Sequence, residues 1–291
     1  MYRSAEPQPI VVAVDGSPHS DAAVEWAAHE SALRKASVIL VNVIAPTPDT
    51  PADPAHCHQS RADSVLTAAE ARLRAVSGPA DALDVRVAVL QSPVLPALID
   101  ASKRAQLIVV GSRGHTALGR LLLGSVSTGL IHRAQCPVAV IPLSAHHRTA
   151  RAHPRPVVVG VDGTVTSEEA IAMAFEEAAC RHADLLAVHA WSDVGVLPLV
   201  GTNQWFEAEA KAKDVLAGRL AHWQEKYPDV HVTGRVVCDE PAHAVIFEAR
   251  CSQLVVVGNR GHTGHAGLQL GAVGSAVVHA SPVPVIVVRG H

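Results

Sequence analysis

The chain has 291 residues, and 48% of them are hydrophobic, which is enough for two cores of ordinary domain size. A formal net charge of −3 and 3% aromatic residues argue against a nucleic-acid partner, because both a basic surface and base-stacking platforms are missing. No apolar run approaches the ~20 residues that span a bilayer, no signal-peptide core follows Met1, and the five cysteines form no CxxC pair, so we expect a cytoplasmic protein with no membrane partner.

Short apolar runs alternate with amphipathic stretches along the first half of the chain. The runs predicted as strands cover 9–14, 37–43, 84–89, 107–110 and 138–142. The stretches predicted as helices cover 20–35, 60–76, 94–104 and 125–134. The strands are continuous Val/Ile runs without polar alternation, which is typical of strands buried on both faces of a parallel sheet. This order predicts an α/β fold with right-handed crossovers, and a surface excursion over the proline-rich segment 45–59.

The second half of the chain repeats the first. IVVAVDGS (10–17) recurs as VVVGVDGT (157–164), and LIVVGSRGHT (107–116) recurs as LVVVGNRGHT (254–263), both 147 residues further on. Pairing Pro93 with Pro241 changes the offset to 148, which predicts a locally compensated insertion. We expect two domains of one kind, 1–145 and 156–291, joined by a polar linker over 146–155.

Each predicted first strand ends in an aspartate, Asp15 or Asp162, followed by glycine and a hydroxyl residue. Open α/β sheets bind ligands at the carboxyl ends of their strands, where this carboxylate can accept hydrogen bonds from a ligand. The small residue two positions earlier, Ala13 or Gly160, would let a ligand approach the backbone. The same Asp-Gly-Ser/Thr sequence also forms turns and caps helices, and both interpretations stay open here.

A glycine loop follows each predicted fourth strand and leads into a helix. A glycine loop that opens a helix presents unshielded N–H groups and a positive dipole end, which suits a phosphate group. Ser125 and Ser127 would add hydroxyl donors in the first copy. The alternative is that the glycines only permit tight turns. The residues of the loop are Gly111, Ser112, Arg113, Gly114, Gly124, Ser125 and Val126, and in the second copy Gly258, Asn259, Arg260, Gly261, Gly271, Ala272 and Val273.

The pattern G-x2-G-x9-G-(S/T), joined to V-D-x-S at the end of the first strand, resembles tandem members of the universal stress protein family. The resemblance covers nearly the whole chain twice. It implies two tandem doubly wound open parallel sheets of five strands each, order 3-2-1-4-5, with ATP between strands 1 and 4. It further implies adenosine contacts at Asp15, Val43, Asp162 and Ala190, and phosphate contacts along both glycine loops. Ala272 departs from the Ser/Thr of the motif.

The resemblance also implies an ATP-binding regulatory protein of stress response or growth regulation, and not an enzyme. Neither loop contains a lysine and no acid–base pair lies near it, which favours nucleotide holding over turnover. Two alternatives stay open: a slow ATP hydrolase or nucleotide-dependent transferase, and an interaction module whose nucleotide site has decayed. Whether Mg²⁺ accompanies ATP is also open.

Two further features of the sequence are its histidine-rich stretches and its apolar fifth strands. The histidine-rich stretches His56-Cys57-His58 and His146-His147 lack the further ligands of a structural metal site, so no metal site is expected. The fifth strands would be apolar sheet edges, which need a cover. We therefore expect them to meet within one chain as an intramolecular pseudo-dimer, with a homodimer as a further option and the regulated protein partner unknown.

Overall fold

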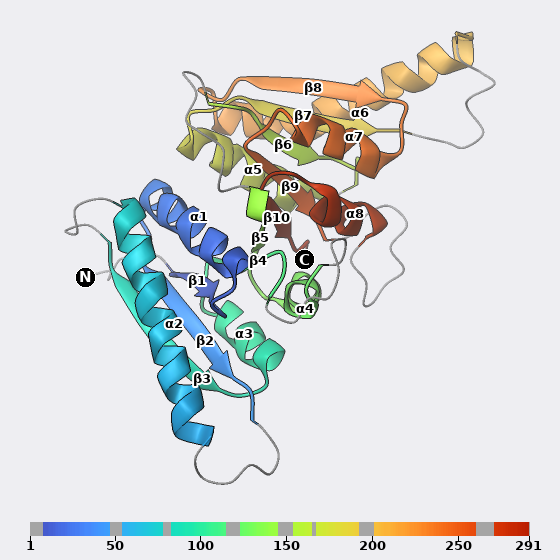
Figure 1. Ribbon diagram of the computed structural model, residues 1–291. Helices are drawn as coiled ribbons and strands as arrows, with labels where there is room; N and C mark the ends of the chain where they lie inside the picture. The colour runs from blue at the N-terminus through green and yellow to red at the C-terminus, as the bar shows by residue number, and fades with distance from the viewer. Residues whose placement is uncertain are drawn as a thin grey trace. The chain divides into compact units, whose positions relative to one another are not determined.

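The computed structural model describes the chain in eight segments, and its backbone divides into two compact units, Met1–His147 and Arg148–His291 (Figure 1). Side chains of residues 54–57 are not described. The described segments are 8–46, 54–77, 83–114, 123–144, 154–164, 167–191, 201–259 and 271–290.

The first unit alternates strands and helices as predicted. Its strands pair in parallel in the order β3-β2-β1-β4-β5, which confirms the doubly wound sheet. Helix α1 packs beside α2, and α3 beside α4. The chain adds strands in one direction up to β3 and in the opposite direction from β4. Because the crossovers are right-handed, this reversal places α1 and α2 on one face of the sheet and α3 and α4 on the other. The elements are β1 (Ile10–Ala13), α1 (Pro18–Arg34), β2 (Val38–Ile44), α2 (Pro54–Ser77), β3 (Val85–Gln91), α3 (Val94–Ser102), β4 (Leu107–Gly111), α4 (Ser125–Arg133) and β5 (Val138–Ile141).

The second unit repeats this architecture, with parallel strands in the order β8-β7-β6-β9-β10. Helix α5 packs beside α6, and α7 beside α8. The central strands of both units are buried and mostly apolar, as the lack of polar alternation predicted. The prediction is wrong for β3, which is partly exposed because it lies at the edge of the sheet. The elements are β6 (Val157–Gly160), α5 (Glu168–Cys180), β7 (Leu185–Ala190), α6 (Asn203–Lys226), β8 (Val232–Val237), α7 (Pro241–Ala249), β9 (Leu254–Gly258), α8 (Ala272–Ala280) and β10 (Val285–Val288).

The offset of 147 residues holds through the third strand and the helix after it, so the predicted insertion at Pro93 is wrong. Pro93 is the residue that precedes α3, whereas Pro241 is the first residue of α7. Helix starts accept proline at either place, because the amide that proline lacks would have no intrahelical partner there. The two prolines are therefore neighbours in the motif and not equivalents.

The predicted excursion over 45–59 is too long, because α2 begins at Pro54. Proline fits the first turn of a helix, so a proline-rich stretch does not exclude a helix start. Residues 47–53 lie outside the described part of the chain.

Each unit buries one glutamate near the end of its first helix. Glu30 in α1 and Glu177 in α5 are 1% and 2% exposed. Arg34 and Arg181, one turn later, pair with them. Since an unpaired buried carboxylate is costly, the arginine is needed at the same place in both units.

Candidate functional site

A cavity of about 490 Å³ opens in the first unit at the carboxyl ends of β1, β2 and β4. Strands β1 and β4 flank the reversal of strand order, which is where doubly wound sheets form a crevice. The predicted site residues that line it are Ala13, Asp15, Val43, Gly111, Arg113, Gly114, Gly124, Ser125 and Val126. The other lining residues are Val14, Ser20, Val41, Asn42, Val94, Leu98, Val110, Leu123 and Ser127.

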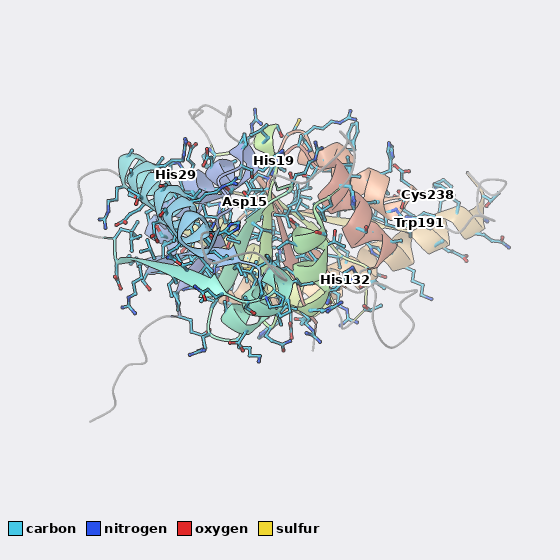
Figure 2. The ribbon with its side chains drawn as sticks, turned by 60° about the horizontal axis from the view of Figure 1, so that its bottom comes forward. Asp15, His19, His29, His132, Trp191 and Cys238 are labelled. Carbon is cyan, nitrogen blue, oxygen red and sulfur yellow. The ribbon has the colours of Figure 1, made fainter. Side chains whose placement is uncertain are left out.

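Asp15, labelled in Figure 2, forms a turn and also lines this cavity. Its Oδ1 accepts the N–H of Ser17 at 2.9 Å, and Gly16 between them has φ +81°, which favours glycine. Ser17 caps α1 by accepting the N–H of Ser20. The other oxygen, Oδ2, lies so close to Gly114 that a Cβ there would be 2.6 Å away. The turn therefore holds one carboxylate oxygen and directs the other toward the glycine loop.

Gly111 and Ser112 contact the start of α1. A Cβ on Gly111 would lie 2.6 Å from the backbone carbonyl carbon of His19, so only glycine allows this approach. Ser112 Oγ lies 3.0 Å from His19 Nδ1. Ser112 does not appear among the lining residues of the cavity, and its side chain instead joins the loop to α1.

Burial lowers the pKa of His19 below its ordinary 6.5, and the nearby Arg113 lowers it further, while Asp15 opposes both. Burial and then Arg133 likewise lower the pKa of His132 in α4. Between the lowered pKa and 6.5 the unfolded chain binds more protons than the folded one.

The folded first unit should therefore lose stability as the pH falls below about 6.5. We expect the urea midpoint of unfolding to drop between about pH 7.5 and about pH 5.5, and to drop less in the double variant His19→Gln/His132→Gln. Urea titrations at both pH values measure this. Equal drops in the two proteins would contradict it.

Helix α4 begins at the cavity without a side-chain cap. Its N-cap, Gly124, donates its own N–H to the Ser112 carbonyl at 2.9 Å, so that amide is not available to a ligand. The next amides, of Ser125, Val126 and Ser127, have no acceptor within the helix. All three residues line the cavity, so the helix start presents donors and a positive dipole end there.

The two serines of this helix start differ. Ser127 is 3% exposed and its Oγ donates to the Gly111 carbonyl at 2.8 Å, so the expectation that it offers a hydroxyl hydrogen to phosphate is wrong. Its hydrogen joins α4 to β4 instead. Ser125 is exposed and lines the cavity, which makes it the hydroxyl donor that remains.

Sequence reasoning missed a polar residue in the second strand of each unit. Asn42 Nδ2 donates to the Val14 carbonyl at 2.7 Å, and His189, at the equivalent position, donates from Nδ1 to the Val161 carbonyl at 2.8 Å. Each bond fixes the backbone directly before the aspartate. The signal was available: each is polar within an otherwise apolar strand.

The second unit places its predicted residues at equivalent positions. Asp162 Oδ1 accepts both the N–H and the Oγ1 hydroxyl of Thr164, at 2.9 and 2.7 Å. Within the described segments, its buried Oδ2 and the Oδ1 of buried Asn259 have no hydrogen-bond partner. Gly160 and Gly258 end β6 and β9, and Ala190 ends β7. Gly271 is the N-cap of α8, and Ala272 and Val273 are its first residues. Arg260 and Gly261 lie outside the described residues.

A guanidinium holds the aspartate turn of the second unit. Arg219 of α6 donates from Nε and Nη2 to the Gly163 carbonyl at 3.1 and 2.9 Å. The equivalent Arg72 of α2 instead pairs with Asp21 and Glu25 on α1. The same residue type therefore supports the aspartate turn in one unit and joins two helices in the other.

The metal candidates are not tested by the structure. The side chains of His56 and Cys57 and the linker histidines lie outside the described residues. Over the described part of the chain, no three His, Cys, Asp or Glu side chains gather as a metal site would require. No helix there is both long and apolar enough to cross a membrane.

The fold and the cavity define a tandem α/β protein of the doubly wound class. The model of the universal stress protein family matches residues 7–142 and 154–289. A universal stress protein of Mycolicibacterium smegmatis is 44% identical over 297 residues, covering 99% of each chain. One of Mycobacterium tuberculosis is 43% identical over 291 residues, covering 96% of each. The chain therefore belongs to the universal stress protein family, with two family domains in tandem.

A solved structure shows the same fold. The crystal structure of a universal stress protein from Archaeoglobus fulgidus matches with a TM-score of 0.68 at 20% identity, and the match covers 98% of this chain and 97% of that one. The architecture thus extends over both units.

Proposed function

We propose that the protein binds ATP in the cavity of the first unit and an adenine nucleotide at the equivalent place in the second, and that it acts as a regulator in stress response or growth. The observation that carries the proposal is the uncapped start of α4, which opens into a cavity with an apolar wall. Nucleotides need both features, since the base is flat and apolar and the phosphates are anionic.

Different lining residues of the cavity suit the base, the ribose and the phosphates of a nucleotide. Val41 and Val43 of β2 and Val94 and Leu98 of α3 offer apolar contact for a base. Asp15 offers a carboxylate oxygen to ribose hydroxyls. The amides of α4, the Ser125 hydroxyl and the loop glycines suit the phosphates. A divalent cation bound with ATP would be held by the phosphates and would offset their charge.

The residues that line the cavity favour binding of a nucleotide over its hydrolysis or transfer. Arg113 and Asp15 are the charged residues among the described lining residues, and neither a lysine nor a histidine lines the cavity there. A candidate general base must reach the attacking nucleophile, and both oxygens of Asp15 have other roles here, because Oδ1 accepts the N–H of Ser17 and Oδ2 is the oxygen proposed for the ribose. We therefore favour a nucleotide-dependent regulator over a hydrolase or transferase.

Analysis of nucleotide released from the denatured pure protein tests the proposal. We expect ATP or another adenine nucleotide in the extract, and a rise in melting temperature when ATP is added to nucleotide-free protein. Absence of both would favour the decayed-site alternative. Steady conversion of added ATP to ADP, abolished by Gly114→Asp, would favour the enzyme.

The two sites should differ in affinity, and one hydroxyl should account for most of the difference. Ser125 begins α4, whereas Ala272 begins α8. A hydrogen bond to a charged phosphate contributes about 1.5–3 kcal/mol, so Ser125→Ala should weaken ATP binding by the first unit roughly ten- to a hundredfold. The reciprocal change Ala272→Ser should strengthen binding by the second unit.

Calorimetric titration measures each site separately when the other is disabled by Asp15→Ala or Asp162→Ala. Tighter binding in the first unit, reversed in part by the reciprocal exchange, is the expected result. Equal affinities in the parent protein, or an exchange without effect, would show that this hydroxyl does not set the order.

A further inference from the structure

The second unit has another cavity, of about 260 Å³, between the β7–β8 edge of its sheet and helix α7. Among the described residues, neither Asp162 nor the start of α8 lines it. It adjoins the proposed nucleotide site at Val188, the equivalent of Val41 in the first unit. Its residues are Val188, Arg235, Val237, Asp239, His243, Ala244, Phe247 and Glu248.

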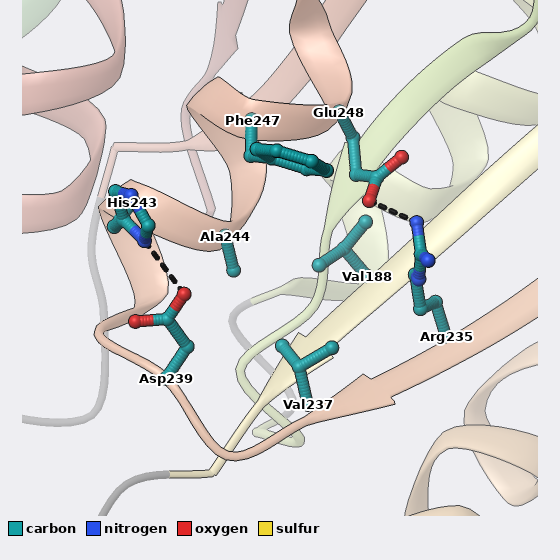
Figure 3. A pocket seen from close by; sticks show the side chains of 8 residues that line it. All are labelled: Val188, Arg235, Val237, Asp239, His243, Ala244, Phe247 and Glu248. Atoms are coloured by element: carbon teal, nitrogen blue, oxygen red, sulfur yellow. Dashed lines mark hydrogen bonds and ion pairs between the residues drawn. The ribbon is translucent and has the colours of Figure 1, made fainter.

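The cavity has an apolar centre and charged ends. Figure 3 shows Val188, Val237 and Ala244 between two ion pairs, with the Phe247 ring above them. Arg235 pairs with Glu248 at one end, and Asp239 Oδ2 lies 2.6 Å from His243 Nδ1 at the other. Phe247 is 55% exposed, so its ring is accessible to a ligand.

The first unit lacks these groups at the equivalent positions. Ala88, Asp100 and Ala101 stand where the second unit has Arg235, Phe247 and Glu248. Asp100 pairs with Lys103 on the surface. The fold therefore does not require the arginine, the aromatic ring or the glutamate, and an explanation specific to the second unit is needed.

We propose that this cavity binds a small zwitterion with an apolar side chain, the class of the free apolar α-amino acids. A volume below the ~300 Å³ of ordinary ligand pockets suits a molecule of that size. The guanidinium of Arg235 has five donors, so it can hold Glu248 and a ligand carboxylate together. The side chain of the ligand would lie on Val188 and Val237, against the Phe247 ring.

The opposite end would bind the ammonium group of the ligand. Asp239 accepts from His243 and, through Oδ1, from the N–H of Glu240 at 2.7 Å. These bonds lower its pKa, so the group is a carboxylate at neutral pH, and a carboxylate offers about four acceptor sites. The positive and negative ends of the cavity thus complement the two charges of the zwitterion.

Calorimetric titration of the full chain with L-leucine, L-methionine and L-phenylalanine tests the proposal. We expect saturable binding in the millimolar range by at least one of them. For the amino acid that binds, the N-acetyl derivative and the amide should each bind about tenfold more weakly, because each lacks one charge. Binding of none of the three, or equal binding of the derivatives, would overturn the proposal.

Residues of the first unit supply matched variants. The double variant Arg235→Ala/Glu248→Ala and the single variant Phe247→Asp each install what the first unit carries, and each should abolish measurable binding. Asp100→Asn, at the position equivalent to Phe247 in the first unit, is the control and should leave binding unchanged. Binding that persists in both second-unit variants would overturn the proposal. Because ATP is not the probe, failure here leaves the proposed nucleotide function untouched.

Discussion

Gly114→Asp should weaken ATP binding by the first unit by about a thousandfold. The new carboxylate would stand at the cavity wall, where the phosphates are proposed to lie, and like charges ~4 Å apart at an effective dielectric near 20 repel by about 4 kcal/mol. The structure adds a second cause, because the Cβ would lie 2.6 Å from Asp15 Oδ2. The new side chain would displace the carboxylate proposed to bind ribose. Calorimetric titration with ATP, with the second site disabled by Asp162→Ala, measures the loss.

Gly114→Asn separates bulk from charge, since asparagine has the shape of aspartate without its charge. We expect an intermediate loss for asparagine and the full loss for aspartate. An unchanged circular dichroism spectrum would show that both variants fold. Parent-like ATP affinity in a folded aspartate variant would contradict the proposed phosphate position.

Gly111→Ala should destabilise the first unit. Overpacking a core costs about 1–3 kcal/mol, and we expect a value toward the upper end of that range. The methyl group would lie 2.6 Å from both the carbonyl carbon and the oxygen of His19. These are backbone atoms at the start of α1, so they cannot move aside as the end of a side chain can. The urea midpoint of the first unit measures the effect, and nucleotide affinity should fall with it because β4 and α1 both border the cavity.

Gly218→Ala is the matched control for this substitution. Gly218 lies within α6, and a Cβ there would meet nothing within 4 Å. Alanine in a helix interior is favoured over glycine by roughly 1 kcal/mol, so this variant should be slightly more stable than the parent. A Gly111→Ala protein as stable as the parent would show that α1 can shift away from β4 at little cost.

The sequence by itself predicted the alternation of strands and helices, the tandem repeat and the two aspartate turns. These follow from patterns within one short segment, or from a comparison of two segments at a fixed offset. The strand order 3-2-1-4-5 was implied only by the resemblance to the universal stress protein family, which rests on the combined motifs. Buried parallel strands favour apolar runs rich in Val and Ile, and the positive φ at Gly16 and Gly163 favours glycine in the two aspartate turns. Both features can be recognised without knowing which other elements the segment contacts.

Individual side chains within these segments needed the tertiary structure. The sequence predicts Ser125 and Ser127 alike as hydroxyl donors to a phosphate. In the structure, however, the Gly111 carbonyl accepts the hydroxyl hydrogen of Ser127. Asn42 and His189 reach a carbonyl directly after the neighbouring strand, 28 residues away. The partner in each case comes from a distant segment, so no local pattern records it.

The cavity beside α7 likewise depends on contacts between different elements. Arg235 and Glu248 are 13 residues apart and on different elements, and Phe247 in the sequence is simply an apolar residue of an amphipathic helix. Only the packing of α7 on β7 and β8 brings an aromatic ring and two ion pairs around one apolar floor. Sequence patterns encode which face of an element is buried, whereas the tertiary structure decides which side chains from different elements meet, because contacts between elements depend on their relative placement in three dimensions.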